Sequence, residues 1–136
     1  MAVDLVRAAI ANHDAMDAQL NAYRTFDATA AIEQAEAADS ALDRAFSHPD
    51  ITPAPLCGIP ISVKDVYGAN GLSTFAGSTR QLPQEPWSRD AWLVARAREA
   101  GAVVMGKTHT VEFAYGGVGL NPDSGTPRNP WDIESQ

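Results

Sequence analysis

The sequence predicts an α/β domain, and three observations carry this prediction. Two stretches near the amino terminus have apolar residues at helical spacing. Two apolar runs, at 59–63 and 102–106, have the length and the β-branched composition of strands. The segment between these runs is long enough for a crossover that contains a helix, which implies that the two strands pair in parallel. We therefore expect two amino-terminal helices followed by a strand, a helix and a strand.

The two amino-terminal helices are predicted from their apolar stripes. The first begins at Ala2 and ends near His13. The second begins after Asp27 or Thr29, either of which can cap it, and it ends before Pro49. Its stripe contains many alanines, which favour helix but make a shallow contact face.

Lys64 follows the first predicted strand directly. In that strand Ile59, Ile61 and Val63 alternate with smaller residues, as in a strand with one buried face. Lysine is almost never buried unless it is paired, so Lys64 is either a side chain that reaches solvent or a functional amine. Desolvation lowers the pKa of an amine, and a neutral amine can take a proton from a hydroxyl nucleophile. From this stretch alone, the solvent-exposed lysine is the more ordinary interpretation.

The crossover helix and the second strand are predicted from capping signals and from hydrophobicity. Ser88 is expected to cap a helix that runs to about Ala100, and Gly101 is expected to terminate it in the left-handed conformation. The continuous apolar run at 102–106 is typical of a strand covered on both faces.

Composition and charge exclude several classes of protein. The 136 residues are 45% hydrophobic and 20% charged, which suits one domain. The net charge of −7 and the scattered basic residues argue against a nucleic-acid surface. The single cysteine, Cys57, cannot form an internal disulfide, and no Cys/His spacing indicates a zinc site, so no metal or cofactor is expected. Without a long apolar run, we expect a soluble, cytoplasmic protein that does not contact a membrane.

Three partial motifs in the second half have weaker support. Gly101–Thr108 has the spacing of a phosphate-binding P-loop, but its central residues form the predicted strand, which argues against nucleotide binding. The glycines of 116–119 fail the dinucleotide fingerprint because Pro122 stands where a third glycine is needed. His109 and Glu112 lie three residues apart, but a metal site needs a third ligand, and surface or capping roles are favoured.

Five segments span nearly the whole chain in order: Gly58–Asp65, Gly71–Ser78, Ala100–Thr108, Glu112–Gly116 and Thr126–Asp132. They resemble successive blocks of the amidase signature family. The resemblance implies an α/β/α sandwich, of which residues 1–136 form an incomplete single domain with a helical segment at 1–50 and the start of the α/β core at 56–136. It also implies hydrolysis of a carboxamide to a carboxylate and ammonia or an amine, by a serine nucleophile, a second serine in a cis peptide and a lysine base.

The lysine of the family motif falls on Lys64, which is therefore the candidate catalytic residue. No serine among the 136 residues matches the catalytic serine motifs of the family, so we expect no turnover by this chain alone. Glu112–Gly119 is expected to form a turn at the substrate mouth, with Tyr115, Gly116 and Gly117 near the leaving amide, because small residues permit close backbone approach. The alternative for this segment is a plain flexible loop.

Two other functions stay open. One is a binding or interaction module that keeps the scaffold without the chemistry, and the other is an amidase subunit similar to that of a tRNA amidotransferase, which the scattered basic residues do not support. The expected partner of the complete protein is a small-molecule amide, with no nucleic acid and no membrane. Strand edges left open in an incomplete sheet predict poor stability or self-association of the isolated chain.

Overall fold

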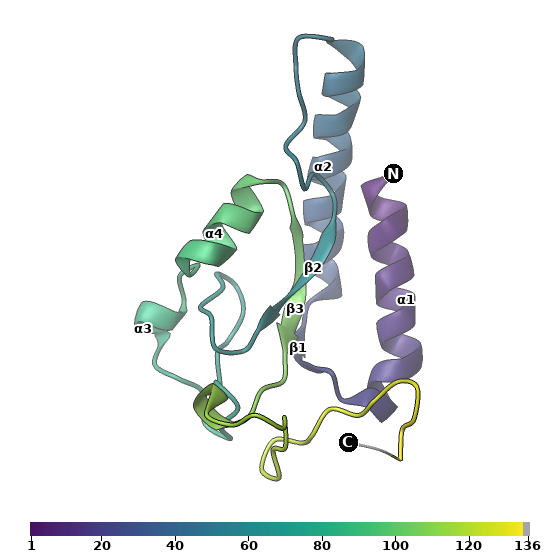
Figure 1. Cartoon of the computed structure of the whole chain (residues 1–136). Coiled ribbons are helices and arrows are strands. Elements are labelled where there is room, and N and C mark those ends of the chain that lie inside the picture. Colours follow the sequence, from purple (N-terminus) through teal and green to yellow (C-terminus); the bar gives the residue numbers. More distant parts are fainter. Residues whose placement is uncertain (135–136) are drawn as a thin grey trace.

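The computed structural model describes residues 1–134, which are arranged in three layers (Figure 1). Two long helices pack on one face of a small mixed sheet, and a shorter helix packs on the other face. The last two residues of the predicted domain lie outside the described residues. The elements are α1 (Ala2–Leu20), β1 (Tyr23–Phe26), α2 (Ala28–Ser47), β2 (Pro60–Lys64), α3 (Gln84–Trp87), α4 (Trp92–Glu99), β3 (Val103–Thr108) and the 3-10 turn η1 (Glu112–Ala114). No helix within residues 1–134 is both long and apolar enough to cross a membrane.

Helix α1 is longer than the sequence predicted. It passes the expected end near His13 and stops at Leu20, where Asn21 adopts a left-handed conformation with φ of 49°. Asparagine tolerates this conformation and commonly ends helices, so Asn21 was the missed stop signal. The Asp17 carboxylate accepts the backbone N–H groups of Ala22 and Tyr23 and fixes the turn that follows.

Helix α2 has the predicted cap and the predicted shallow face. The Asp27 carboxylate accepts the backbone N–H of Ala30 at 2.9 Å, so Asp27 rather than Thr29 is the cap. Further along α2, the buried Asp39 accepts the backbone N–H of Ala2 at 2.6 Å and that of Val3 at 3.2 Å. Asp39 therefore satisfies the free N–H groups at the start of α1 and joins the two helices.

The sheet has the strand order β1-β3-β2. Strands β2 and β3 pair in parallel, which confirms the predicted arrangement, and β3 is buried almost throughout. Strand β1 was missed because it has only four residues between two helices. It pairs antiparallel with β3, and its Tyr-Arg-Thr-Phe sequence is rich in residues that favour strands. Within residues 1–134, β2 has a partner on one side only.

The start of the crossover helix differs from the prediction. Helix α4 begins at Trp92 after Ala91, and Ser88 does not cap it, because the Ser88 hydroxyl donates to Glu85 in the preceding short helix α3. The predicted stop is confirmed: Gly101 has φ of +89°, and a Cβ there would lie 2.8 Å from Cys57 Cα.

A bulge in β3 decides which face of the sheet Lys107 occupies. Val104 pairs with Ile61 and Lys107 with Val63, so the register skips one residue near Met105. Met105 packs with α1 and α2, whereas Val104 and Val63 pack on the α4 face. Paired residues of neighbouring strands point to the same face, so Lys107 lies on the α4 face with Val63. Strict alternation from Met105 would have placed Lys107 on the other face.

Candidate active site

Lys64 lies at the carboxyl end of β2, where the parallel strands end and the long loops begin (Figure 1). Its side chain is exposed, and no residue among 1–134 forms a hydrogen bond or an ion pair with its amine. The described residues therefore leave this amine free to meet a group from outside them. Its predicted catalytic role stays a prediction.

The face that carries Lys64 also carries a tyrosine and a serine. Ser62 shares this face by strand alternation, and Tyr23 of β1 reaches Ser62 with a hydrogen bond across Gly106 of β3. A Cβ on Gly106 would lie 3.1 Å from Tyr23 Cδ1, so the glycine leaves the space that the ring needs. Burial raises the pKa of Tyr23; the hydrogen bond with Ser62 opposes this shift, and the Asp17 carboxylate adds a still smaller effect in the raising direction. Tyr23 is therefore a neutral phenol at pH 7.

Lys107, the other lysine of the chain, is completely buried. Its ammonium nitrogen lies 3.0 Å from Asp65 Oδ1, donates to the Ser73 carbonyl at 3.3 Å and also donates to the Thr74 hydroxyl. Burial lowers the pKa of Lys107, and the hydrogen bond and charge of Asp65 oppose that shift.

This pair was not predicted from the sequence, where Lys107 stands in a segment with the spacing of a P-loop. A lysine inside a buried strand requires a carboxylate, and Asp65 at the same end of the neighbouring strand was the available one. The structure also supports the rejection of the P-loop, since Gly106, Lys107 and Thr108 lie within β3 and Lys107 is buried.

Asp65 joins the loop that follows β2 to the sheet. Both of its carboxylate oxygens accept the backbone N–H of Phe75, at 3.3 and 3.2 Å. The Arg24 guanidinium of β1 lies over the Phe75 ring, 4.1 Å from its centroid. The loop is therefore held from two strands, at the point where Lys64 leaves the sheet.

His109 and Glu112 do not form a metal site within residues 1–134, where no cluster of three suitable ligands occurs. His109 is partly buried, and Glu112 begins η1. Desolvation lowers the pKa of His109, and Arg24 adds to that shift against the weaker opposing effect of Asp65 and Asp17.

The predicted mouth residues lie on a turn that is separate from Lys64. Tyr115 is 96% exposed and lines an open hollow of about 580 Å³ with Phe113 and Leu120. Gly117 faces open space, whereas a Cβ on Gly116 would lie 3.2 Å from the Val111 side chain. The edge of β2 that includes Lys64 borders a different hollow, of about 140 Å³, beside Leu93 and Val94 of α4. The contact of Tyr115, Gly116 and Gly117 with a leaving amide stays a prediction.

Hydrogen bonds join the loop that follows β2 to the loop that follows β3. The buried Asn121 amide donates to the Gly77 carbonyl at 2.7 Å and to the Thr110 carbonyl at 2.9 Å, so it joins the loop after β2 to the loop after β3. Phe113 has φ of 50°, and its N–H donates to the Ala76 carbonyl at 2.6 Å. Left-handed backbone at such residues persists only where the surroundings fix it, and it is typical of functional sites.

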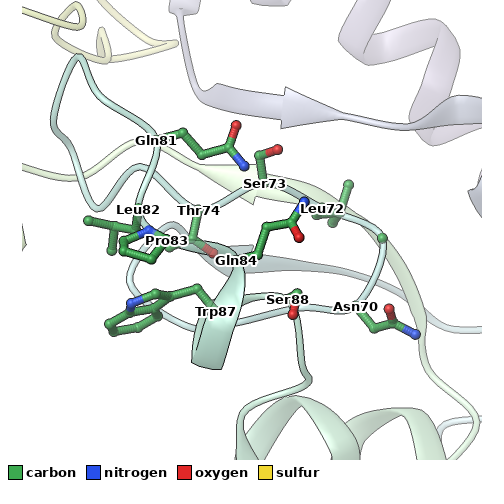
Figure 2. A pocket seen from close by; sticks show the side chains of 11 residues that line it. Asn70, Leu72, Ser73, Thr74, Gln81, Leu82, Pro83, Gln84, Trp87 and Ser88 are labelled. Atoms are coloured by element: carbon green, nitrogen blue, oxygen red, sulfur yellow. The ribbon is translucent and has the colours of Figure 1, made fainter.

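A third hollow lies under the loop 70–88 and is less suited to a substrate. Figure 2 shows Gln81, Gln84 and Ser73 around it, and no charged side chain lines it. Its volume of about 170 Å³ is below the 300 Å³ or so of a typical ligand pocket. Two residues of its lining, Ser73 and Thr74, accept hydrogen bonds from Lys107, so this part of the lining supports the buried ion pair.

The profile of the Amidase family matches residues 4–136. The chain belongs to the amidase family. It is 48% identical over 130 residues to the 2-amino-5-chloromuconic acid deaminase of Comamonas testosteroni, covering 96% of this chain and 27% of the deaminase. It is 39% identical over 132 residues to a glutamyl-tRNA(Gln) amidotransferase component of Geobacter metallireducens, covering 97% of this chain and 26% of that component.

Solved amidase structures share the fold of this segment. The peptide amidase of Stenotrophomonas maltophilia is 33% identical with a TM-score of 0.77, and the match covers 97% of this chain and 27% of that enzyme. A protein of a vestigial complex, connected with the evolutionary origins of an s-triazine catabolic enzyme, is 37% identical with a TM-score of 0.84, with 97% and 28% covered. These matches confirm the predicted family and fold class. The chain spans about a quarter of the length of the relatives it matches.

Proposed function

We propose that this chain supplies the base-bearing part of an amidase, and that Lys64 is the general base of a serine, cis-serine and lysine relay. The observation that carries this proposal is the free, exposed amine of Lys64 at the carboxyl end of a parallel strand pair, in the segment that resembles the lysine motif of the family. In open α/β sheets, ligands bind beyond the carboxyl ends of the strands.

The proposed chemistry is hydrolysis of a carboxamide C–N bond. The Lys64 amine takes the proton from the serine relay, the nucleophilic oxygen bonds to the carbonyl carbon, and the C–N bond breaks as the nitrogen leaves with a proton. Water then attacks the acyl ester, which releases the carboxylate and restores the serine. Residues outside these 136 would supply both serines and the oxyanion donors.

Relatives indicate the class of substrate. One relative is a deaminase of 2-amino-5-chloromuconic acid and another is a peptide amidase, so small molecules with a C–N bond next to an unsaturated carbon or a carbonyl group fit this scaffold. We propose that the hollow beside Tyr115 borders the path of the leaving amide in the complete enzyme. A ligand-bound structure of that enzyme tests this: a ligand more than about one side-chain length from Tyr115 would exclude the role.

A second candidate function is that of a non-catalytic or amidotransferase component within a larger complex. The similarity to a component of an amidotransferase, together with the similarity to a protein of a vestigial complex, favours it. The same Lys64 substitution separates the two candidates, because only the catalytic function depends on the amine.

The test uses a chimera in which residues 1–136 replace the matching segment of the Comamonas deaminase; we call it the amidase chimera. Removal of a general base lowers the rate by about 10²- to 10⁴-fold, so Lys64→Ala should lower kcat at least 100-fold. Arg96→Ala is the control, because Arg96 is an exposed cation whose partners, Glu99 and the Trp92 ring, lie on the same helix α4. If Lys64→Ala stays within a few-fold of the parent chimera, Lys64 is not the base.

A further inference from the structure

A buried ion pair lies directly beneath the end of the strand that carries Lys64. Asp65, the next residue, is fully buried, and so is its partner Lys107. In the strand register Lys107 pairs with Val63 and Thr108 pairs with Lys64. The ion pair and the exposed amine therefore lie at the same end of the two strands. Asp65 and Lys64 point to opposite faces, because successive residues of a strand alternate.

Stability alone does not explain why this pair is buried. Burial of two charges carries a desolvation cost that often equals or exceeds their attraction, and well-packed apolar residues in their place are often neutral or stabilising. What the pair does achieve is a fixed geometry. The Asp65 carboxylate holds the Lys107 ammonium and the Phe75 N–H, while the Asp65 backbone N–H donates to the Thr108 carbonyl at 3.0 Å.

The backbone around Lys64 is fixed on both sides of its side chain. Its carbonyl accepts the N–H groups of Val66 and Tyr67, at 2.7 and 3.1 Å, which forms the turn out of β2. Asp65 anchors that turn from the α4 face through Lys107. Rotation of the strand end, which would move the Lys64 amine, therefore requires the buried pair to break.

We propose that Lys107 is a positioning residue for Lys64: it holds Asp65 on the α4 face, which fixes the end of β2 and leaves the Lys64 amine on the opposite face. The pairing also keeps the Asp65 carboxylate occupied, so that it does not pair with the neighbouring Lys64 amine. This inference rests on the proposed function of Lys64 as base. Thr74, whose hydroxyl accepts from Lys107, supports the same arrangement.

The experiment compares three changes in the amidase chimera. Lys107→Met leaves Asp65 buried without its partner and is expected to lower the thermal midpoint. The double variant Lys107→Met with Asp65→Asn removes both charges and should recover much of that midpoint. Thr74→Val loosens the hold on Lys107 with little change of volume. Arg98→Met is the matched control, since it removes the cation of another partly buried ion pair, that with Asp90, together with its hydrogen bonds to Gln34 and Asn70.

A positioning role predicts a specific kinetic signature. Because a displacement of about 1 Å can cost roughly 100-fold in rate, the double variant should lose about 10- to 100-fold in kcat while KM changes less than about two-fold. Thr74→Val should lower kcat by about three-fold or more with the same KM. Arg98→Met should keep kcat even though it lowers the thermal midpoint.

The outcomes separate this inference from the function on which it rests. If kcat of the double variant returns together with its thermal midpoint, the pair is only structural and the inference is wrong. If the double variant does not fold, Thr74→Val decides by the same criterion, and an unchanged kcat overturns the inference. If Lys64→Ala retains activity in parallel, the proposed function fails instead.

Discussion

Replacement of Asn121 by aspartate tests whether one side chain holds the two loops at the carboxyl end of the sheet. Asn121 is 3% exposed, and its amide donates to the Gly77 and Thr110 carbonyls. Its Oδ1 atom accepts the N–H groups of Asp123 and Ser124 at 3.1 and 3.0 Å. Aspartate has the same shape and keeps both accepted bonds, but it has no donor and places a negative charge against two carbonyl oxygens.

The expected cost follows from the two lost bonds. The Thr110 carbonyl loses its donor, which costs about 1–3 kcal/mol, whereas the Gly77 carbonyl keeps the Ser124 hydroxyl at 3.3 Å, so its lost bond costs only about 1 kcal/mol. Asn121→Asp should therefore destabilise the joined loops by about 2–4 kcal/mol. If local opening limits exchange, this corresponds to roughly 30- to 700-fold faster hydrogen exchange of the amides at 110–115. Exchange measured by mass spectrometry on the amidase chimera checks this value.

The control for this prediction is Asn129→Asp. Asn129 is exposed, and its side-chain oxygen accepts the N–H of Trp131, a bond that aspartate preserves. Its exchange should therefore match that of the parent. If the amides at 110–115 exchange no faster in Asn121→Asp than in Asn129→Asp, Asn121 does not hold the two loops together.

Three further predictions concern packing, pH and the isolated chain. Gly106→Ala should lower the thermal midpoint and separate β1 from β3, because its Cβ would lie 2.3 Å from a carbonyl oxygen of β1; Gly117→Ala, in open space, should be neutral. Burial lowers the pKa of His109, so as the pH falls below the ordinary value of 6.5 the unfolded chain binds the proton more readily and stability falls. His109→Gln should flatten this acid-side slope in unfolding measurements, whereas His48→Gln, at an exposed position, should leave it unchanged. Residues 1–136 alone should release no ammonia from amides and should self-associate in light scattering through the open edge of β2; a monomer with a sharp unfolding transition would contradict the structural part.

The sequence predicted the elements whose signals are local and repeated. The apolar stripe of α2, with Asp27 before it and Pro49 after it, predicted that helix almost to the residue. The continuous apolar run at 102–106 predicted β3, because a strand covered on both faces needs no alternation. The crossover between β2 and β3 then predicted their parallel pairing.

The sequence did not predict what depends on tertiary contacts. Strand β1 is too short to show periodicity, and it exists because β3 offers it a partner. The start of α4 was misplaced because Ser88 bonds Glu85, which local capping preference cannot anticipate. The Lys107–Asp65 pair depends on the bulge that turns Lys107 to the α4 face, and a one-residue change of register cannot be read from composition.

We propose that Lys64, and not the buried Lys107, serves as the base. The most direct measurement is a crystal structure of the amidase chimera with an amide-derived inhibitor bound to its serine. If Lys64 is the base, its amine should lie within about 2.6–3.2 Å of a serine hydroxyl of the relay, with Lys107 still paired to Asp65. A Lys64 amine that points to solvent, away from every serine of the relay, would contradict it.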